Sequence, residues 1–84
     1  YPNPFNPTTT LKYDLPEDAM VNITIYDMMG RRIKTLVNGP KSAGYRSVIW
    51  DATNDYGKPV SAGLYLYTIR AGSFRQTKKM VMLK

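Results

Sequence analysis

Residues 20–28 read MVNITIYDM, and this stretch indicates the fold more clearly than any other part of the chain. Val21, Ile23 and Ile25 alternate with other residues, which is the period-two pattern of a strand with one buried face. β-branched side chains also favour the pleated surface of a sheet. The sequence therefore predicts a β-strand here. The residues that we expect to face outward are Asn22, Thr24 and Tyr26.

Similar strands are predicted on both sides of this segment. Before it, Leu11, Tyr13 and Leu15 alternate with polar residues until Pro16. After it, residues 27–30 predict a turn. The remaining expected strands are 31–37, which Asn38-Gly39-Pro40 should end, 45–50, which follows Gly44, a strand that begins at Gly63 and ends before Gly72-Ser73, and 74–83.

The number and spacing of these strands indicate one small all-β domain. About seven short strands, separated by turn signals and without helical periodicity, are typical of an immunoglobulin-like, two-sheet antiparallel β-sandwich. The 84 residues can build one hydrophobic core and not two. We expect residues 1–7, which contain three prolines, to form an extended lead-in, and residues 8–84 to form the single domain.

The expected core combines the inward-facing residues of these strands, and Trp50 is its largest member. Tyr65 and Tyr67 could form a sugar-stacking surface, but we favour a core position with the hydroxyl groups at the rim. The predicted core residues are Leu11, Tyr13, Val21, Ile23, Ile25, Val48, Trp50, Tyr67 and Ile69.

The composition argues against an enzyme. The chain contains no Cys and no His, which excludes disulfides, thiolate metal sites and every Ser-His or Cys-His pair. None of its serines lies in a Gly-x-Ser-x-Gly elbow, and nothing in the sequence places two carboxylates across a pocket. We therefore expect no catalytic residues and no cofactor.

One oxygen-rich segment follows Trp50. Asp51, Asn54 and Asp55 are weak candidates for a calcium site, but their spacing does not match the EF-hand pattern. Asn and Asp also stabilise turns through bonds to nearby backbone groups, and Gly57 accommodates a positive φ. A loop braced by these side chains, without a metal, is the interpretation that we favour.

The net charge of +6 raises nucleic acid, acidic polysaccharide or an anionic membrane surface as partners. Lysines on a terminal strand also discourage edge-to-edge aggregation, and we favour that role, with anionic glycan or lipid headgroups as the alternative. We expect no nucleic-acid partner, because a stacking platform needs interleaved aromatics and the last strand offers only Phe74. The basic residues form two groups, Arg31, Arg32 and Lys34, and Arg75, Lys78, Lys79 and Lys84.

No stretch approaches 18 consecutive apolar residues, so we expect no transmembrane segment. A charged and then apolar leader that ends in small residues is also not found, which predicts no signal peptide. The sequence begins at Tyr1 rather than Met. We expect the chain to be a processed or excised piece.

Several weak motifs occur in a fixed order along almost the whole chain. They are YPNPFNPTT from Tyr1, Tyr13-x-Leu15-Pro16, Val21 to Asp27 followed by Met29-Gly30-Arg31, Trp50-Asp51, Asn54-Asp55-x-Gly57, Ser61-Ala62-Gly63-x-Tyr65-x-Tyr67, and Lys78-Lys79-Met80 to Lys84. In this order the motifs resemble the type A C-terminal sorting domain of the type IX (Por) secretion system, which is related to the Ig-like domain of the flagellar hook-capping protein.

The resemblance implies a non-catalytic domain that directs a secreted cargo through an outer-membrane translocon to the cell surface or the medium, by way of the periplasm. Its implied partners are the translocon, a processing peptidase and an upstream cargo domain such as a protease, glycosidase or adhesin. The residues that correspond to the family's signal are Pro2, Asn3, Pro4, Gly63, Tyr65, Lys79 and Lys84.

Two other functions are compatible with the sequence. A self-assembling extracellular subunit of a filament or array could use the arm 1–7 or a terminal strand that pairs by β-addition. A carbohydrate-binding module is the weaker alternative, because we expect Trp50 to be buried.

Overall fold

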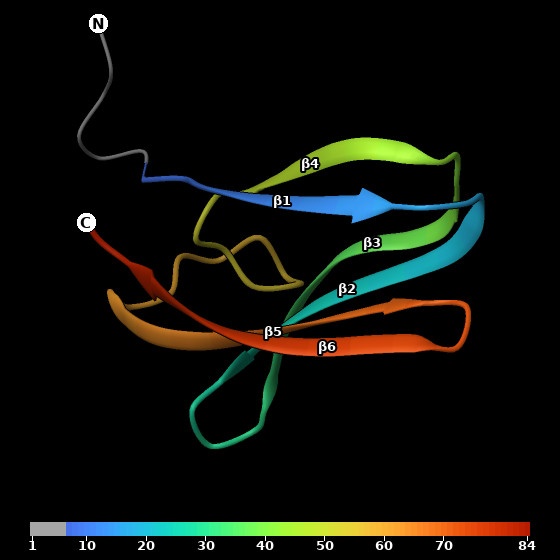
Figure 1. The fold of residues 1–84 in the computed structure, drawn as a ribbon. Helices are drawn as coiled ribbons and strands as arrows, with labels where there is room; N and C mark the ends of the chain where they lie inside the picture. The colour runs from blue at the N-terminus through green and yellow to red at the C-terminus, as the bar shows by residue number, and fades with distance from the viewer. Residues whose placement is uncertain (1–6) are drawn as a thin grey trace, which may run out of the picture.

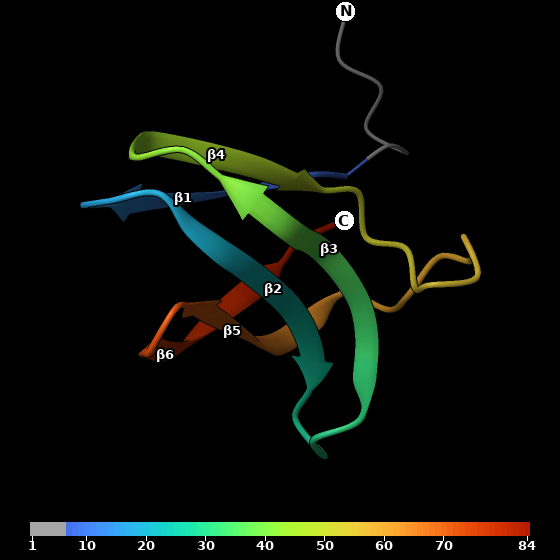
Figure 2. The ribbon, with the colours of Figure 1, turned by 90° about the vertical axis from the view of Figure 1, so that its right-hand side faces the viewer.

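Two antiparallel β-sheets make up residues 7–84 of the computed structural model, which are the residues that the structure describes. β1 and β4 form one sheet, and the other has the strand order β3-β2-β5-β6. The sheets face each other (Figures 1 and 2), which confirms the predicted all-β, immunoglobulin-like sandwich. Residues 7–84 form no helix with the length and hydrophobicity that a membrane crossing requires. The strands are β1 (Thr9–Leu15), β2 (Ala19–Asp27), β3 (Arg32–Lys41), β4 (Gly44–Trp50), β5 (Gly63–Ala71) and β6 (Phe74–Met82).

Two connections carry the chain from one sheet to the other at the same end of the sandwich (Figure 1). Residues 16–18 join β1 to β2, and residues 42–43 join β3 to β4. The side-chain Oδ1 of Asp18 accepts a hydrogen bond of 2.8 Å from the backbone N–H of Ala43. One carboxylate therefore ties both crossovers together.

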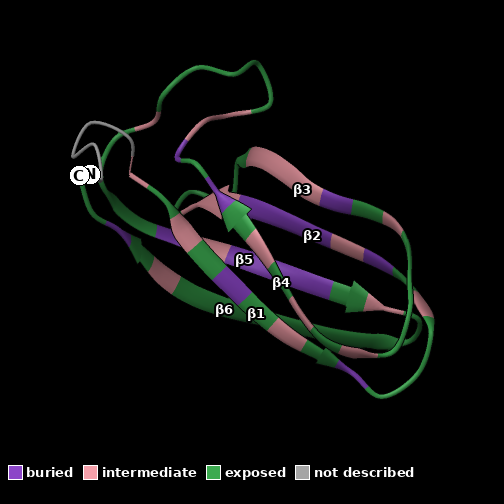
Figure 3. Ribbon diagram, turned by 90° about the horizontal axis from the view of Figure 1, so that it is seen from above, coloured by how far each residue is buried: buried purple, intermediate pink, exposed green. Residues whose placement is uncertain are grey.

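The core lies between the two sheets, and the buried residues follow β2 and β5 as stripes (Figure 3). Seven of the nine predicted core residues are buried, and Trp50 has an exposed fraction of 0%. Tyr13 and Val48 are only half-buried and pack against the core, although Leu11 and Trp50 of the same two-stranded sheet are buried. Tyr65 is buried too, in agreement with the core position favoured for it. The other buried apolar residues, which the predicted core did not include, are Leu15, Val37, Ala52 and Met82.

The prediction that Asn38-Gly39-Pro40 ends the third strand was wrong, because β3 continues to Lys41. Met20 of β2 is paired with Pro40. β3 is an edge strand, and an edge tolerates a proline because one side of the strand needs no N–H donor. Register shifts in the β2–β3 pair, after Ile23 and after Ile25, explain the weak periodicity of residues 31–37.

The prediction that Thr24 is an outward, exposed residue was also wrong in part, since only 4% of Thr24 is exposed. β2 is an interior strand, and Thr24 is aligned with Thr35 of β3 and Thr68 of β5. The Thr24 hydroxyl donates a hydrogen bond of 2.7 Å to Oδ1 of Asn22, which satisfies the buried group.

Candidate functional site

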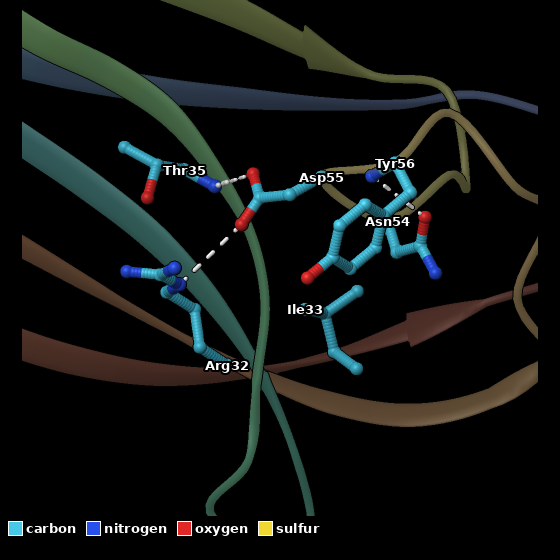
Figure 4. A pocket seen from close by; sticks show the side chains of 6 residues that line it. All are labelled: Arg32, Ile33, Thr35, Asn54, Asp55 and Tyr56. Atoms are coloured by element: carbon cyan, nitrogen blue, oxygen red, sulfur yellow. Dashed lines mark hydrogen bonds and ion pairs between the residues drawn. The ribbon is translucent and has the colours of Figure 1, made fainter.

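Residues 51–60 form a loop that Asp55 fastens to β3 (Figure 4). Oδ1 of Asp55 accepts a hydrogen bond of 3.0 Å from the backbone N–H of Thr35, and Oδ2 lies 3.3 Å from Nε of Arg32. The backbone N–H of Asp55 donates to the carbonyl of Ile33 at 2.9 Å. These bonds close a small hollow, which is lined by Arg32, Ile33, Thr35, Asn54, Asp55 and Tyr56.

The three calcium candidates have structural partners in this loop. Oδ1 of Asp51 accepts hydrogen bonds from the backbone N–H and the hydroxyl of Thr53. Oδ1 of Asn54 accepts from the backbone N–H groups two and four residues later, at 2.9 and 3.0 Å. Asp55 holds β3, as described above. Within residues 7–84 no three His, Cys, Asp or Glu side chains are grouped so that they could hold a metal ion.

The hydrogen bonds to the carboxyl groups of Asp27 and Asp51 also shift the pKa values of these groups. The backbone N–H of Arg31 lowers the pKa of Asp27, and the guanidinium of Arg31 adds to the effect. The hydroxyl of Thr53 lowers the pKa of Asp51. Burial raises the pKa of Tyr65. Each shifted carboxyl is therefore an ionised acceptor in a turn, rather than a base poised near neutral pH.

Gly63 and Tyr65 shape the start of β5. Gly63 has a φ of 147°, which favours glycine, although a Cβ there would meet no atom within 4 Å. Tyr65 is buried and donates a hydrogen bond of 2.6 Å to the carbonyl of Ser61. Its ring meets Trp50 edge-on, with 5.0 Å between the ring centroids. The structure therefore places Tyr65 in the core rather than on a surface.

The two lysines of the predicted signal are exposed, with Lys79 in β6 and Lys84 beyond its end. Lys79 is paired with Leu66 of β5. The start of β1 lies near the end of β6 (Figure 1). The Thr9 hydroxyl of β1 is 3.8 Å from Sδ of Met82 in β6. The remaining predicted residues, Pro2, Asn3 and Pro4, and most of the lead-in 1–7 lie outside the described residues.

One pair of cations was missed at the sequence level. Arg70 of β5 lies directly opposite Arg75 of β6, and both are exposed. Sequence reasoning assigned Arg75 to the last basic group and left Arg70 out. The signal that could have found the pair is the Gly72-Ser73 turn, since the two arginines lie at equal distances from it.

Several solved structures resemble the fold, and three of them are described below. FlgD from P. aeruginosa has a TM-score of 0.71 at 22% identity, and the match covers 89% of this chain and 59% of that one. FlgD from Xanthomonas campestris, described as giving insights into hook capping essential for flagellar assembly, has a TM-score of 0.70 at 24% identity, with 92% and 56% covered. At these identities the two FlgD structures show the fold alone.

The third structure is that of dimeric latent PorU from Porphyromonas gingivalis, with a TM-score of 0.66 and 25% identity. It matches 96% of this chain, but this chain spans only 8% of PorU and less than two thirds of either FlgD chain. No curated protein shows significant sequence similarity.

The family model of the FlgD Ig-like domain matches residues 5–73, which is most of the 84-residue chain. This match and the two-sheet architecture agree with the part of the sequence resemblance that concerned the hook-capping protein. The chain belongs to the FlgD Ig-like domain family.

Proposed function

We infer that this domain is a non-catalytic sorting and anchoring module, which directs a secreted cargo through the type IX outer-membrane translocon to the cell surface or the medium. The observation that carries the proposal is the fixed order of motifs from Tyr1 to Lys84. The structural similarity to PorU, which covers 96% of this chain, supports the proposal. The motifs point to the Por secretion system, and PorU carries the same Por name. The partners of this function are the translocon, a processing peptidase and an upstream cargo domain.

The placement of the signal residues supports recognition by a protein. Lys79 and Lys84 are exposed on or beside an edge strand, where a reader can approach the backbone and the side chains together. Gly63 is opposite Met82, so the start of the penultimate strand lies beside the end of the terminal strand, where Lys84 follows. Tyr65 supports the start of β5 from the core side through its contact with Trp50.

A secretion assay tests the proposal. The complete chain is fused behind a reporter and expressed in a strain that has the type IX apparatus and in one that lacks it. We expect the reporter in the medium only in the first strain, and a loss of secretion with K79Q/K84Q or with residues 74–84 deleted. K12Q/K41Q removes the same charge from exposed sites outside β6 and should leave secretion intact.

Secretion that persists in K79Q/K84Q, or that does not need the apparatus, would overturn the proposal. Thermal melts of each purified fusion distinguish a lost signal from a lost fold. The proposal therefore requires that K79Q/K84Q is folded by its thermal melt and still fails to reach the medium.

A self-assembling extracellular subunit is a second candidate, and the free sheet edges favour it. The β1–β4 sheet has only two strands, and its β4 carries exposed Tyr45 and Ile49, with exposed fractions of 92% and 60%. Exposed edges and apolar side chains promote strand pairing between chains. This candidate predicts oligomers at micromolar concentration that I49K disperses, and a strictly monomeric sedimentation profile would contradict it.

Carbohydrate binding has less support, because the aromatic ring that would stack on a sugar is enclosed. Trp50 is fully buried, and its Nε1–H donates a hydrogen bond of 2.8 Å to the carbonyl of Thr53. We expect no sugar-dependent change in tryptophan fluorescence.

A further inference from the structure

The charges of this domain are unevenly distributed along the chain. Residues 63–84 contain five of its 12 Lys and Arg residues and no Asp or Glu. The carboxylates all occur earlier, and the three ion pairs within residues 7–84 hold other cations. Those paired cations are Arg31, Arg32 and Lys34. The β5–β6 hairpin is therefore a concentrated and unneutralised source of positive charge.

The hairpin register gathers part of this charge on one face. Tyr67 and Ile69 point into the core, so alternation places Arg70 on the opposite, outer face of β5. Arg75 is its direct cross-strand partner and therefore shares that face. Like charges directly opposite each other are unfavourable in a sheet, which makes the pair costly for the isolated domain.

The other end of the same face is apolar. Leu64 of β5 is paired with Val81 of β6, and their exposed fractions are 47% and 52%. Between the two ends, Lys79 is paired with Leu66. We name this surface the outer hairpin face, and it consists of Leu64, Leu66, Thr68, Arg70, Arg75, Thr77, Lys79 and Val81.

The outer hairpin face contains cations and exposed aliphatic side chains, but no carboxylate and no aromatic ring. Nucleic-acid surfaces of sheets use aromatic rings for base stacking, which this face does not offer. Exposed aliphatic groups beside cations instead suit an interface that combines anionic headgroups with acyl chains. The chemistry therefore favours a lipid surface over a nucleic acid.

We propose that the outer hairpin face binds an anionic lipid surface, with the Arg70–Arg75 pair on the headgroups and the Leu64–Val81 pair against the acyl boundary. An anionic headgroup between the two arginines removes their mutual repulsion. This activity does not depend on the proposed sorting function, since it requires neither a translocon nor Lys84.

Vesicle co-sedimentation tests the proposal with the complete chain. The probes are vesicles of phosphatidylcholine alone and vesicles in which part of it is replaced by phosphatidylglycerol. We expect binding to the anionic vesicles only. In R70Q/R75Q the partition coefficient should fall by about thirtyfold, because each Lys or Arg near an anionic surface contributes roughly fivefold.

The matched control is K12Q/K41Q, which removes the same charge at exposed positions outside the outer hairpin face. This control should reduce binding by less than about threefold, since Lys12 and Lys41 would attract the anionic vesicle only through long-range electrostatics, which salt screens. L64T/V81T keeps the charge and should weaken binding to anionic vesicles at high salt. Thermal melts establish that each variant is folded.

Equal losses in R70Q/R75Q and K12Q/K41Q would overturn the proposal, because binding would then follow net charge alone. Equal binding to neutral and anionic vesicles would also overturn it. Binding of single-stranded DNA or heparin that depends on Arg70 and Arg75, without vesicle binding, would assign the face to a different polyanion and would reject the lipid surface.

Discussion

The β2–β3 and β5–β6 hairpins have the same construction and both are basic, but they differ in whether their cations have carboxylate partners. In each, one strand is interior to the sheet and the other is an edge. Three of the four cations of the β2–β3 hairpin pair with carboxylates, as Arg31 does with Asp27 at 2.8 Å and Arg32 with Asp55 at 3.3 Å. The β5–β6 hairpin has no carboxylate of its own. The difference teaches that cations on similar edges can support a turn in one place and remain available to a partner in another.

The strongest test of this comparison removes core contacts that the two hairpins share. Ile23 of β2 and Ile69 of β5 are cross-strand neighbours, with exposed fractions of 0% and 5%. Truncation of either to Ala should cost about 2–5 kcal/mol, measured by chemical denaturation. Ile49→Ala, at an exposed site on β4, should cost less than about 1 kcal/mol. A small loss at Ile69 alone would show that the hairpins do not share one core.

Removing the carboxylate that joins the loop to β3 should have the next largest effect. Asp55→Ala leaves the backbone N–H of Thr35 without its acceptor and Arg32 without its partner. We expect a loss of about 1–2 kcal/mol in the free energy of unfolding. Glu17→Ala, in the exposed β1–β2 connection, should change it by no more than about 0.5 kcal/mol. Equal effects in the two variants would contradict the role of Asp55.

Substitution of an arginine should change the free energy of unfolding in opposite directions in the two hairpins. Arg70→Gln removes a like-charge pair and should raise the free energy of unfolding by about 0.2–1 kcal/mol at low salt. Arg32→Gln removes an exposed ion pair and should lower it by less than about 1 kcal/mol. Melts at low and high ionic strength check both, since salt should diminish each effect. The same sign for both variants would refute the comparison.

The smallest expected effect is on the pH dependence of stability, through two carboxyl groups that belong to the β2–β3 turn and to the loop after β4. In the folded protein the backbone N–H of Arg31 holds the pKa of Asp27, and the hydroxyl of Thr53 that of Asp51, below the ordinary value of 3.8. Their contribution to stability is therefore present above that value and is lost as the pH falls through the lower folded pKa. Thermal melts below pH 4 should show a steeper loss for the natural protein than for D27N/D51N. Parallel profiles would show that these two carboxyls do not contribute.

Local patterns were sufficient to predict most strands and the centre of the core. Alternation identified β2, and Val21, Ile23 and Ile25 are all buried. Trp50 could be assigned to the core because no other side chain is as large and because Val48 shares its face. These predictions succeed because side chains alternate along any strand, whatever its neighbours are.

Other positions depend on neighbours that are distant in the sequence. Pro40 was read as a strand breaker, but β3 lies at an edge, where a missing N–H is tolerated. Thr24 was expected to be exposed, but Thr35 and Thr68 flank it. Tyr13 is half-buried, although Leu11 and Leu15 on the same face of β1 are buried. None of these facts follows from local periodicity.

The candidate site divides in the same way. The motifs, the lysines Lys79 and Lys84 and a core position for Tyr65 could be recognised from sequence, whereas the edge-on contact of Tyr65 with Trp50 is visible only in the fold. The charge of residues 63–84 is also a property of the sequence. Only the fold places Arg70 and Arg75 on one face and brings Asp55 to Arg32.

The amino-acid sequence was enough to specify the strands, the all-β class and the excess of positive charge, because these depend on side-chain chemistry and on a period of two residues. The tertiary structure alone settled which strands are edges, which outward residues are covered and which charges find partners. Packing of the two sheets brings together residues as far apart as Thr9 and Met82, and no pattern of neighbouring residues encodes that proximity. The two basic groups look alike as sequence, and only the fold separates the paired one from the free one.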